Sequence, residues 1–265
     1  MPEISALWSP APADATAWLA QLSGDDGLTG YLVPGLPDAA WVLNAMYERE
    51  EGPGTVSHHA ARRAALADGS AEPLVAGGLD LDGEGLLTTG GGLGWARHPG
   101  PGWRRLRWAE LARRGGEPVV REGMLPSHRS APDATAEDGS WLVGVEPPTE
   151  GSLDRESWDR LTALLAEHSP AGPDTPCLAY YNPMVMRAVE YGSRHVLAGR
   201  LGDARALAGL DDPDFSPSNL WAADGSWVVC TDYDLWATKV AGSTSLVGAV
   251  LADTELEAVR LPWAG

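Results

Sequence analysis

Two aspartates near the C-terminal end are the residues whose spacing most directly suggests chemistry. Asp232 and Asp234 lie in the run 226–235, whose alternation of side chains predicts a strand. Residues two apart on a strand share a face and lie about 7 Å apart, a separation at which two carboxylates can act as an acid–base pair or hold a metal ion. The nearby Trp221 would line such a site. Because no His or Glu stands close by at ligand spacing, we interpret the pair as a solvated strand end and expect no catalytic role and no metal.

A second candidate is the one basic cluster of the chain, which surrounds two tryptophans, Trp103 and Trp108. Its basic members are Arg97, His98, Arg104, Arg105 and Arg107. Guanidinium groups beside indole rings bind anions or stack on bases, which makes Arg104 and Arg107 candidate binding residues. The alternative is internal: the arginines pair with surplus carboxylates, and the tryptophans belong to the core.

Motifs of the common enzyme classes are absent from the sequence. His58 and His59 are neighbours on a predicted helix, so they point in different directions and cannot form a metal-binding pair one turn apart. The glycine-rich segment 77–94 has neither the GK[ST] of a phosphate loop nor dinucleotide-binding spacing, and it predicts a loop. Cys177 and Cys230 lie in apolar runs without a CxxC pattern, which is typical of buried, reduced thiols; the alternative is a disulfide between the two, which the sequence does not decide. We expect no cofactor, and the sequence assigns no catalytic residue.

Composition and charge narrow the classes of partner. The 265 residues are 44% hydrophobic and 21% charged, as in a globular protein, and the formal net charge is −18 with a pI of about 4.6. A field of this sign repels phosphate backbones, so we expect no nucleic-acid binding, and it attracts a basic protein partner. No apolar run reaches the roughly 18 residues needed to span a membrane. Since the first residues also lack the basic start of a signal peptide, we expect a cytoplasmic protein.

Periodicity and capping residues predict interleaved helices and strands. Helices are expected at 12–22, 39–50 (capped by Asp38), 58–68 (capped by Ser57), 108–114, 154–168, 203–207 and after a cap at Ser243 or Thr244. Strands are expected at 30–34, 177–181, 188–191, 194–201, 226–235 and 256–261. Without a regular βαβ repeat, this order indicates an α/β (α+β) fold, with helices packed on a mixed, mainly antiparallel sheet. The chain forms one compact unit over 1–265, or two lobes, 1–125 and 141–265, joined by the polar loop 126–140.

The most specific block of the sequence is the run SPSNLW at 216–221. It is continued by Asp224, Trp227, Val228, Thr231, Asp232, Gly242, Ser243, Leu256 and Glu257. This block resembles a stretch of a family of uncharacterised, mostly actinobacterial proteins, which typically reads SPNLWWPADRAWCVATEVD followed by GGS and LE. Here Ala222 and Ala223 replace Trp and Pro, and Gly225 replaces Arg. The resemblance, with weaker blocks at 31–34, 107–110 and 144–148, implies a shared fold and carries over no activity.

The leading functional hypothesis is a non-enzymatic protein that binds a basic protein partner through its acidic surface. Immunity and antitoxin-like proteins are one such class. The alternative is an enzyme of the hydrolase type, with a site lined by Trp221, Asp232 and Asp234. A pocket that encloses these carboxylates would favour the enzyme, whereas a flat acidic face would favour the binding protein. The sequence indicates neither the partner nor the oligomeric state.

Overall fold

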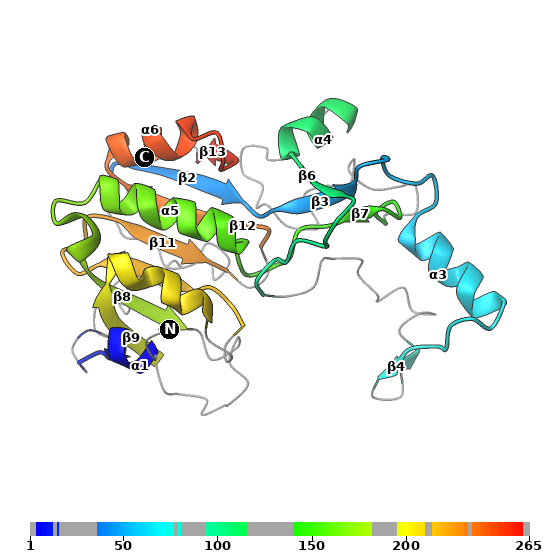
Figure 1. Cartoon of the computed structure of the whole chain (residues 1–265), viewed down its shortest axis with the longest axis horizontal. Helices are drawn as coiled ribbons and strands as arrows, with labels where there is room; N and C mark the ends of the chain where they lie inside the picture. Colours follow the sequence, from blue (N-terminus) through cyan, green and yellow to red (C-terminus); the bar gives the residue numbers. More distant parts are fainter. Residues whose placement is uncertain are drawn as a thin grey trace.

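An eight-stranded antiparallel sheet is the centre of the protein, shown as a computed structural model in Figure 1. The structure describes residues 4–12, 15, 36–76, 79–80, 94–115, 140–181, 195–209, 214–232 and 235–261. The strand order is β1-β9-β8-β10-β11-β12-β2-β13. The bounds are Ser9–Pro10 (β1), Asp38–Leu43 (β2), Pro176–Tyr181 (β8), His195–Arg200 (β9), Asn219–Ala222 (β10), Val228–Thr231 (β11), Ala237–Gly242 (β12) and Ala258–Arg260 (β13). The early strand β2 therefore lies between two strands from the C-terminal end.

Helices cover one face of this sheet (Figure 1). They are α1 (Ile4–Leu7), α5 (Arg155–Glu167), the 3-10 helix η5 (Leu201–Gly209) and α6 (Thr244–Ala252). The largest apolar cluster lies between them and the strands, and in it Trp158 and Leu161 of α5 are buried together with Leu220 and Val229. The opposite face of the sheet carries a smaller apolar cluster that includes Trp221. The central strands β10, β11, β12 and β2 are thus buried on both faces, whereas the edge strand β1 is exposed.

Side-chain caps define where the helices begin. Asp154 accepts a hydrogen bond from the backbone N–H of Ser157 at 2.9 Å ahead of α5. Ser57, ahead of α3 (His58–Ala67), and Ser243, ahead of α6, cap their helices in the same way. Each cap satisfies a donor that the first turn of a helix leaves unpaired. The helices predicted at these three caps are confirmed.

A smaller, three-stranded sheet continues from the same run of chain. After β2 the chain passes Asn44 and Ala45 and enters β3 (Met46–Arg49), which lies between β6 (Trp103–Leu106) and β7 (Val145–Glu146). Figure 1 shows β2 and β3 nearly in line. One continuous run of backbone therefore belongs to both sheets and fixes how they meet.

The helix α4 (Trp108–Gly115) ties the small sheet to the large one. Trp108 packs in one cluster with Met46 of β3 and with Trp236, which precedes β12. Glu257, just before β13, accepts the first two backbone N–H groups of α4 at 2.9 and 2.8 Å, so a residue far along the chain caps this helix. The remaining elements are β4 (Val75–Ala76), β5 (Leu79–Asp80) and the 3-10 helix η3 (Gly172–Asp174). Within the described ranges, no helix has the length and apolar character required to cross a membrane.

The helix predicted at 39–50 is wrong, because this segment forms β2 and β3. Asp38, the predicted cap, is the first residue of β2 and pairs with Arg260 of β13. The cause lies in burial: Trp41 faces one apolar cluster and Val42 faces another, on opposite sides of the sheet. A strand buried on both faces is apolar throughout and has no alternation to distinguish it from a buried helix.

The strand predicted at 226–235 is too long. β11 ends at Thr231, and the carbonyl of Asp232 accepts the backbone N–H of Leu235 at 3.2 Å in a turn. The chain then enters β12, which the sequence does not predict, because its small residues and the charged Lys239 do not resemble a core strand. All of β12 is nevertheless buried.

The predicted fold class is confirmed, since every ladder between the described strands is antiparallel and helices pack on the large sheet. The predicted elements at 30–34 and 188–191, and nearly all of 12–22, lie outside the described residues. So does almost all of the loop 126–140. The choice between one unit and two lobes therefore stays a prediction.

Candidate functional site

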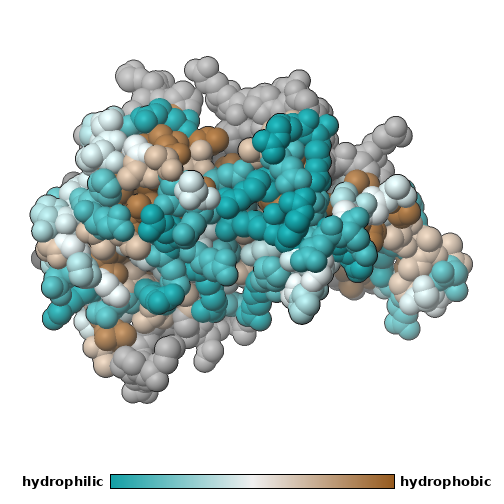
Figure 2. All heavy atoms as spheres, turned by 45° about the horizontal axis from the view of Figure 1, so that its top comes forward, coloured by the Kyte–Doolittle hydropathy of each residue, from teal (hydrophilic) through white to brown (hydrophobic). Residues whose placement is uncertain are grey.

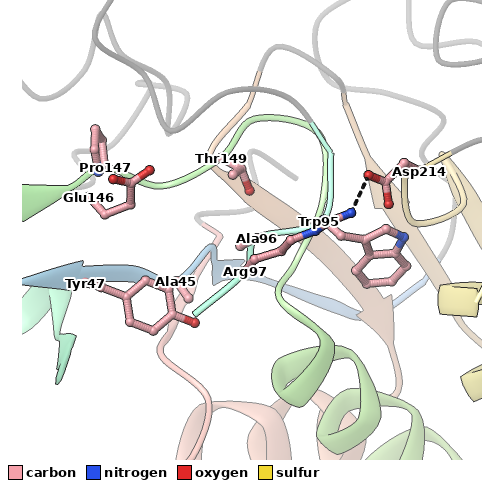
Figure 3. A pocket seen from close by; sticks show the side chains of 9 residues that line it. All are labelled: Ala45, Tyr47, Trp95, Ala96, Arg97, Glu146, Pro147, Thr149 and Asp214. Atoms are coloured by element: carbon pink, nitrogen blue, oxygen red, sulfur yellow. Dashed lines mark hydrogen bonds and ion pairs between the residues drawn. The ribbon is translucent and has the colours of Figure 1, made fainter. Parts of the chain in front are cut away.

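A pocket of about 350 Å³ lies where the two sheets meet (Figure 3). We call it the junction pocket. Its lining residues are Ala45, Tyr47, Trp95, Ala96, Arg97, Glu146, Pro147, Thr149 and Asp214. The volume is near the lower end of the ~300–1,000 Å³ typical of small-molecule sites. Four segments far apart in the sequence contribute to it, so only the fold brings its polar groups together.

The shared strand run positions the first wall of the junction pocket. Ala45 lies at the crossing between the sheets, and Tyr47 follows on β3. Tyr47 is the register partner of Glu146 on β7, so the two side chains lie on the same face of the small sheet. Their neighbours Glu48 and Val145 are partners in the same ladder and lie on the opposite face, toward α4. Strand alternation thus separates the pocket from the core beneath α4.

The segment 94–97 forms a second wall, and backbone hydrogen bonds fix its start. The N–H of Gly94 donates to the carbonyl of Glu150 at 2.9 Å, and the N–H of Trp95 donates to the carbonyl of Asp214 at 3.2 Å. Gly94 has a φ of +93°, and a Cβ on it would collide with the Asp214 carbonyl oxygen, so this approach requires glycine. The Trp95 ring packs edge-on against Trp158 of α5 with 5.8 Å between centroids. The second wall is therefore anchored in the main core.

Burial changes the titration of two groups in the pocket. Desolvation, reinforced by the negative charge of Asp154, raises the pKa of Tyr47 to about 12, so its phenol stays protonated at neutral pH. Desolvation also raises the pKa of Glu146, although His58 opposes the shift and part of this side chain remains exposed. No cationic side chain of the described residues lies within ion-pair distance of Glu146. A cation placed beside it would stabilise the charged carboxylate.

Two further polar groups complete the pocket. Arg97 donates to a carboxylate oxygen of Asp214 at 3.1 Å across the mouth, with the two side chains 75% and 36% exposed. Thr149 is 9% exposed, and its hydroxyl has no hydrogen-bond partner. Figure 3 shows this hydroxyl pointing toward the space between Glu146 and Trp95. The pocket therefore offers one partly exposed carboxylate, with a buried, unpartnered hydroxyl in its wall and a second carboxylate held by Arg97.

The pocket does not have the composition of a metal site. In the part of the chain that the structure describes, no three His, Cys, Asp or Glu side chains are grouped so that they could hold a metal ion.

The predicted binding residues Arg104 and Arg107 lie outside the junction pocket and contact other parts of the chain. Arg104 pairs with the buried Glu48 and with Glu110, at 2.7 Å from the latter. Arg107 donates to the carbonyls of Thr254 and Glu255, both at 3.1 Å. Figure 2 shows how hydrophilic side chains gather over α4, where Glu110 lies. These contacts agree with the internal interpretation of the basic cluster, and a role for Arg104 and Arg107 in binding stays a prediction.

The predicted residues Trp221, Asp232 and Asp234 also lie away from the junction pocket. Trp221 is 2% exposed and belongs to the apolar cluster on the sheet face opposite the helices. Asp232 is half-buried and opens the turn after β11, and Asp234 lies outside the described residues. Whether the two carboxylates converge therefore stays untested.

A row of buried polar side chains crosses this same face of the large sheet. Asn219, Cys230 and Lys239 are successive register partners on β10, β11 and β12, and they are 0%, 5% and 3% exposed. Neither amide atom of Asn219 has a hydrogen-bond partner. The Lys239 ammonium lies 4.9 Å from the centre of the Trp41 ring, and burial lowers its pKa. We refer to these three residues as the buried polar row.

Comparisons of the chain with protein-family models, with curated proteins and with solved structures found no match. The resemblance of the C-terminal block to an actinobacterial family stays a prediction.

Sequence reasoning missed the polar residues of the junction pocket. The wrong helix at 39–50 placed Tyr47 on an apolar stripe, although it lies on a strand. Glu146 and Thr149 flank a pair of prolines that ends β7, and a carboxylate at such a strand end is the one local signal. Asp214 belongs to no motif at all.

Proposed function

We propose that this protein is a non-catalytic binding protein that recognises a basic protein partner, in the manner of immunity and antitoxin proteins. The supporting observation is the distribution of charge: arginines are engaged within the chain, and surplus carboxylates face solvent. A cytoplasmic setting is part of the proposal, because Cys177 and Cys230 are both buried and are not joined in a disulfide.

Ion pairs occupy many of the described arginines. Pairs join Arg104 and Arg114 to Glu48, Arg105 to Asp154, Arg160 to Asp253, Arg205 to Asp159 and Arg260 to Asp38. In contrast, several exposed carboxylates have no ion-pair partner within the described residues. They are Glu50, Glu72, Glu146, Glu156 and Glu255. These five carboxylates face solvent and are not neutralised by a neighbouring cation of the described chain, in a protein whose formal net charge is −18.

An acidic surface favours a partner with positive charge. The summed field accelerates the approach of a basic protein and disfavours a nucleic acid, whose phosphates it repels. Charges at the rim of an interface mainly change the association rate and its dependence on salt. A strong salt dependence of association is therefore the signature that this proposal requires.

In the experiment, the purified chain is immobilised on a resin and exposed to a lysate of its own source cells. The captured proteins are then identified by mass spectrometry. The best candidate is then purified, and its association rate is measured between about 10 mM and about 150 mM salt, over which the Debye length falls from about 30 Å to about 8 Å. We expect a basic partner whose association slows by at least tenfold over this range. A partner of acidic pI, or an association rate that salt leaves unchanged, would overturn the proposal.

A second candidate function, an enzyme with a site near Trp221, is favoured by one observation. Asn219 lies two residues before Trp221 on the same strand, is fully buried, and leaves both amide atoms without a partner. Unsatisfied buried polar groups cost free energy, and function is a common reason for keeping them. An Asp232→Asn variant that folds normally but loses turnover in a hydrolase substrate screen would support the enzyme. Equal turnover by the variant and the parent chain would exclude this enzyme site.

A further inference from the structure

The junction pocket has the chemistry of a site for a planar cation. We propose that it binds the guanidinium group of an arginine side chain, presented by the basic partner. The inference rests on the proposed function and adds to it the place and the chemical group that are recognised. Three lining residues carry it: Glu146, Tyr47 and Thr149.

Glu146 and Tyr47 form the charged and aromatic part of the site. As direct partners in an antiparallel ladder, their Cβ atoms are expected within about 4.5–5.5 Å of each other, so a planar group bound at Glu146 lies beside the Tyr47 ring, which is 6% exposed and meets His98 edge-on at 4.9 Å. A guanidinium accepts this arrangement because it donates hydrogen bonds to a carboxylate in its plane and stacks on aromatic rings through its face. The same chain already uses this contact elsewhere, since Arg49 lies 5.5 Å from the centre of the Trp103 ring.

Thr149 supplies an independent observation. Its side chain is about nine-tenths buried, its hydroxyl has no partner, and Figure 3 shows that hydroxyl directed into the pocket. A buried hydroxyl without a hydrogen bond is destabilising, and a ligand N–H group that reaches it after a small shift of the lining would satisfy it. A guanidinium has five N–H donors, enough for Glu146 and for Thr149 at the same time.

Arg97 acts as a competitor inside the site. Its guanidinium already pairs with Asp214, the other carboxylate of the pocket, at 3.1 Å. Both side chains keep considerable exposure, so the pair is weak and an incoming guanidinium can exchange with it. The pocket therefore already contains one guanidinium–carboxylate pair, at Asp214.

Removing the negative charge of Glu146 and removing the positive charge of Arg97 should have opposite effects on arginine binding. Glu146→Gln removes the free carboxylate and should weaken arginine binding by about three- to tenfold, as expected for a charge-assisted hydrogen bond at a half-exposed site. Arg97→Gln frees Asp214 and should strengthen binding by about two- to fivefold. The matched controls are Glu255→Gln and Arg113→Gln, which change the same charges on exposed residues outside the pocket lining.

The test uses the full chain and a short peptide with one central arginine. A second peptide carries citrulline, which keeps the shape of arginine but has no charge. Binding is followed by the NMR shift of the Trp95 indole N–H, assigned with a Trp95→Phe variant, because this ring lines the pocket. We expect a Kd near 1 mM or tighter for the arginine peptide and at least tenfold weaker binding of the citrulline peptide. Urea midpoints of all variants confirm that they are folded.

Two results would overturn the inference. One is equal binding of the arginine and citrulline peptides, or no shift of the Trp95 signal up to about 10 mM peptide. The other is that Glu146→Gln and Glu255→Gln weaken the basic partner equally, while its salt dependence remains. In that case the proposed function stands and the pocket assignment fails. Binding of the arginine peptide in the pocket, without any basic protein partner, would support the pocket and refute the proposed function.

Discussion

Replacement of the buried Glu48 by Gln should lower the free energy of unfolding by about 2 kcal/mol. This value is the loss of charge-assisted hydrogen bonds, partly offset by the hydration of the arginines that they leave. The Glu48 side chain is 2% exposed and accepts hydrogen bonds from Arg114 at 2.6 and 2.8 Å, and it also pairs with Arg104. It therefore adds ion pairs between β3 and β6, which are also joined by their backbone ladder, and ties β3 to α4, which packs on it through one apolar cluster. Gln has nearly the same shape, so the substitution removes the charge and leaves the packing.

The magnitude follows from the contacts. A hydrogen bond to a charged group contributes about 1.5–3 kcal/mol, and Gln retains one acceptor of the two. Arg104 and Arg114 are 40% and 39% exposed, so water takes over part of their solvation, and Glu110 continues to pair with both. A loss of about 2 kcal/mol corresponds to a fall in Tm of about 4–8 °C. The urea midpoint should fall by about 0.7 M if the slope is near 3 kcal/mol per M.

The pH dependence gives a second, independent check. Hydrogen bonds from Arg114, more than any other cause, hold the pKa of Glu48 below its ordinary value. A lowered folded-state pKa means that the stabilisation is complete above the unfolded pKa of about 4.3 and is lost as the pH falls through the folded pKa. The difference in stability between the parent chain and Glu48→Gln should therefore shrink on acidification.

The assay is urea unfolding followed by tryptophan fluorescence, at neutral pH and at acidic pH, with Glu255→Gln as the control. Glu255 is exposed and has no ion-pair partner among the described residues, so its replacement should change stability by less than about 0.5 kcal/mol. Equal midpoints for the two variants would refute the reasoning. A loss of stability in Glu48→Gln that is the same at neutral and at acidic pH would also refute it.

Three further predictions concern the core. Trp227 is 1% exposed and donates through its indole N–H to Ser169 at 2.9 Å, so Trp227→Ala should cost about 3–5 kcal/mol, and an unchanged urea midpoint would contradict its core position. Gly199→Ala should lower the free energy of unfolding by about 1–3 kcal/mol, because a Cβ at this position meets the Trp8 ring at 2.6 Å. Gly248→Ala in α6 should be neutral or stabilising, because its Cβ meets nothing within 4 Å. Equal shifts of the two variants in thermal unfolding would refute this contrast. Burial raises the pKa of Cys177 to about 12, so a thiol reagent should label it only after unfolding, and immediate labelling of the native chain would show that the thiol is accessible.

The sequence predicted the helices of the described chain better than its strands. Asp154, Ser57 and Ser243 precede helices as capping residues, and capping depends on a few neighbouring residues that can be read locally. The periodicity of the predicted helix at 154–168 and of the predicted strand at 226–235 also predicts that Trp158, Trp227 and Tyr233 are buried. Trp158 and Trp227 are 0% and 1% exposed, which confirms their part of this prediction, and Tyr233 lies outside the described residues.

The strands and the pocket depend on distant contacts and were harder to predict. β2 is buried on both faces because it pairs with β12 and β13 from the end of the chain and because an apolar cluster packs on each side of it. No local sequence pattern contains that information. β12 consists largely of small residues that are buried only because their neighbours are present. The junction pocket combines Tyr47, Glu146 and Asp214 from separate segments, so it exists in the fold and in no stretch of sequence.

The position of β2 between β12 and β13 imposes an order on biosynthesis. Asp38 pairs with Gly242, and the other edge of β2 pairs with β13, so both partners emerge from the ribosome long after β2 itself. At about 5–20 residues per second, translation leaves this apolar strand with two open edges for roughly 10–40 s. Open edges of apolar strands are sites of aggregation, and pairings of such high contact order form slowly. Expression yield should therefore depend on translation speed and on chaperones that bind extended chains, even where the finished protein is stable.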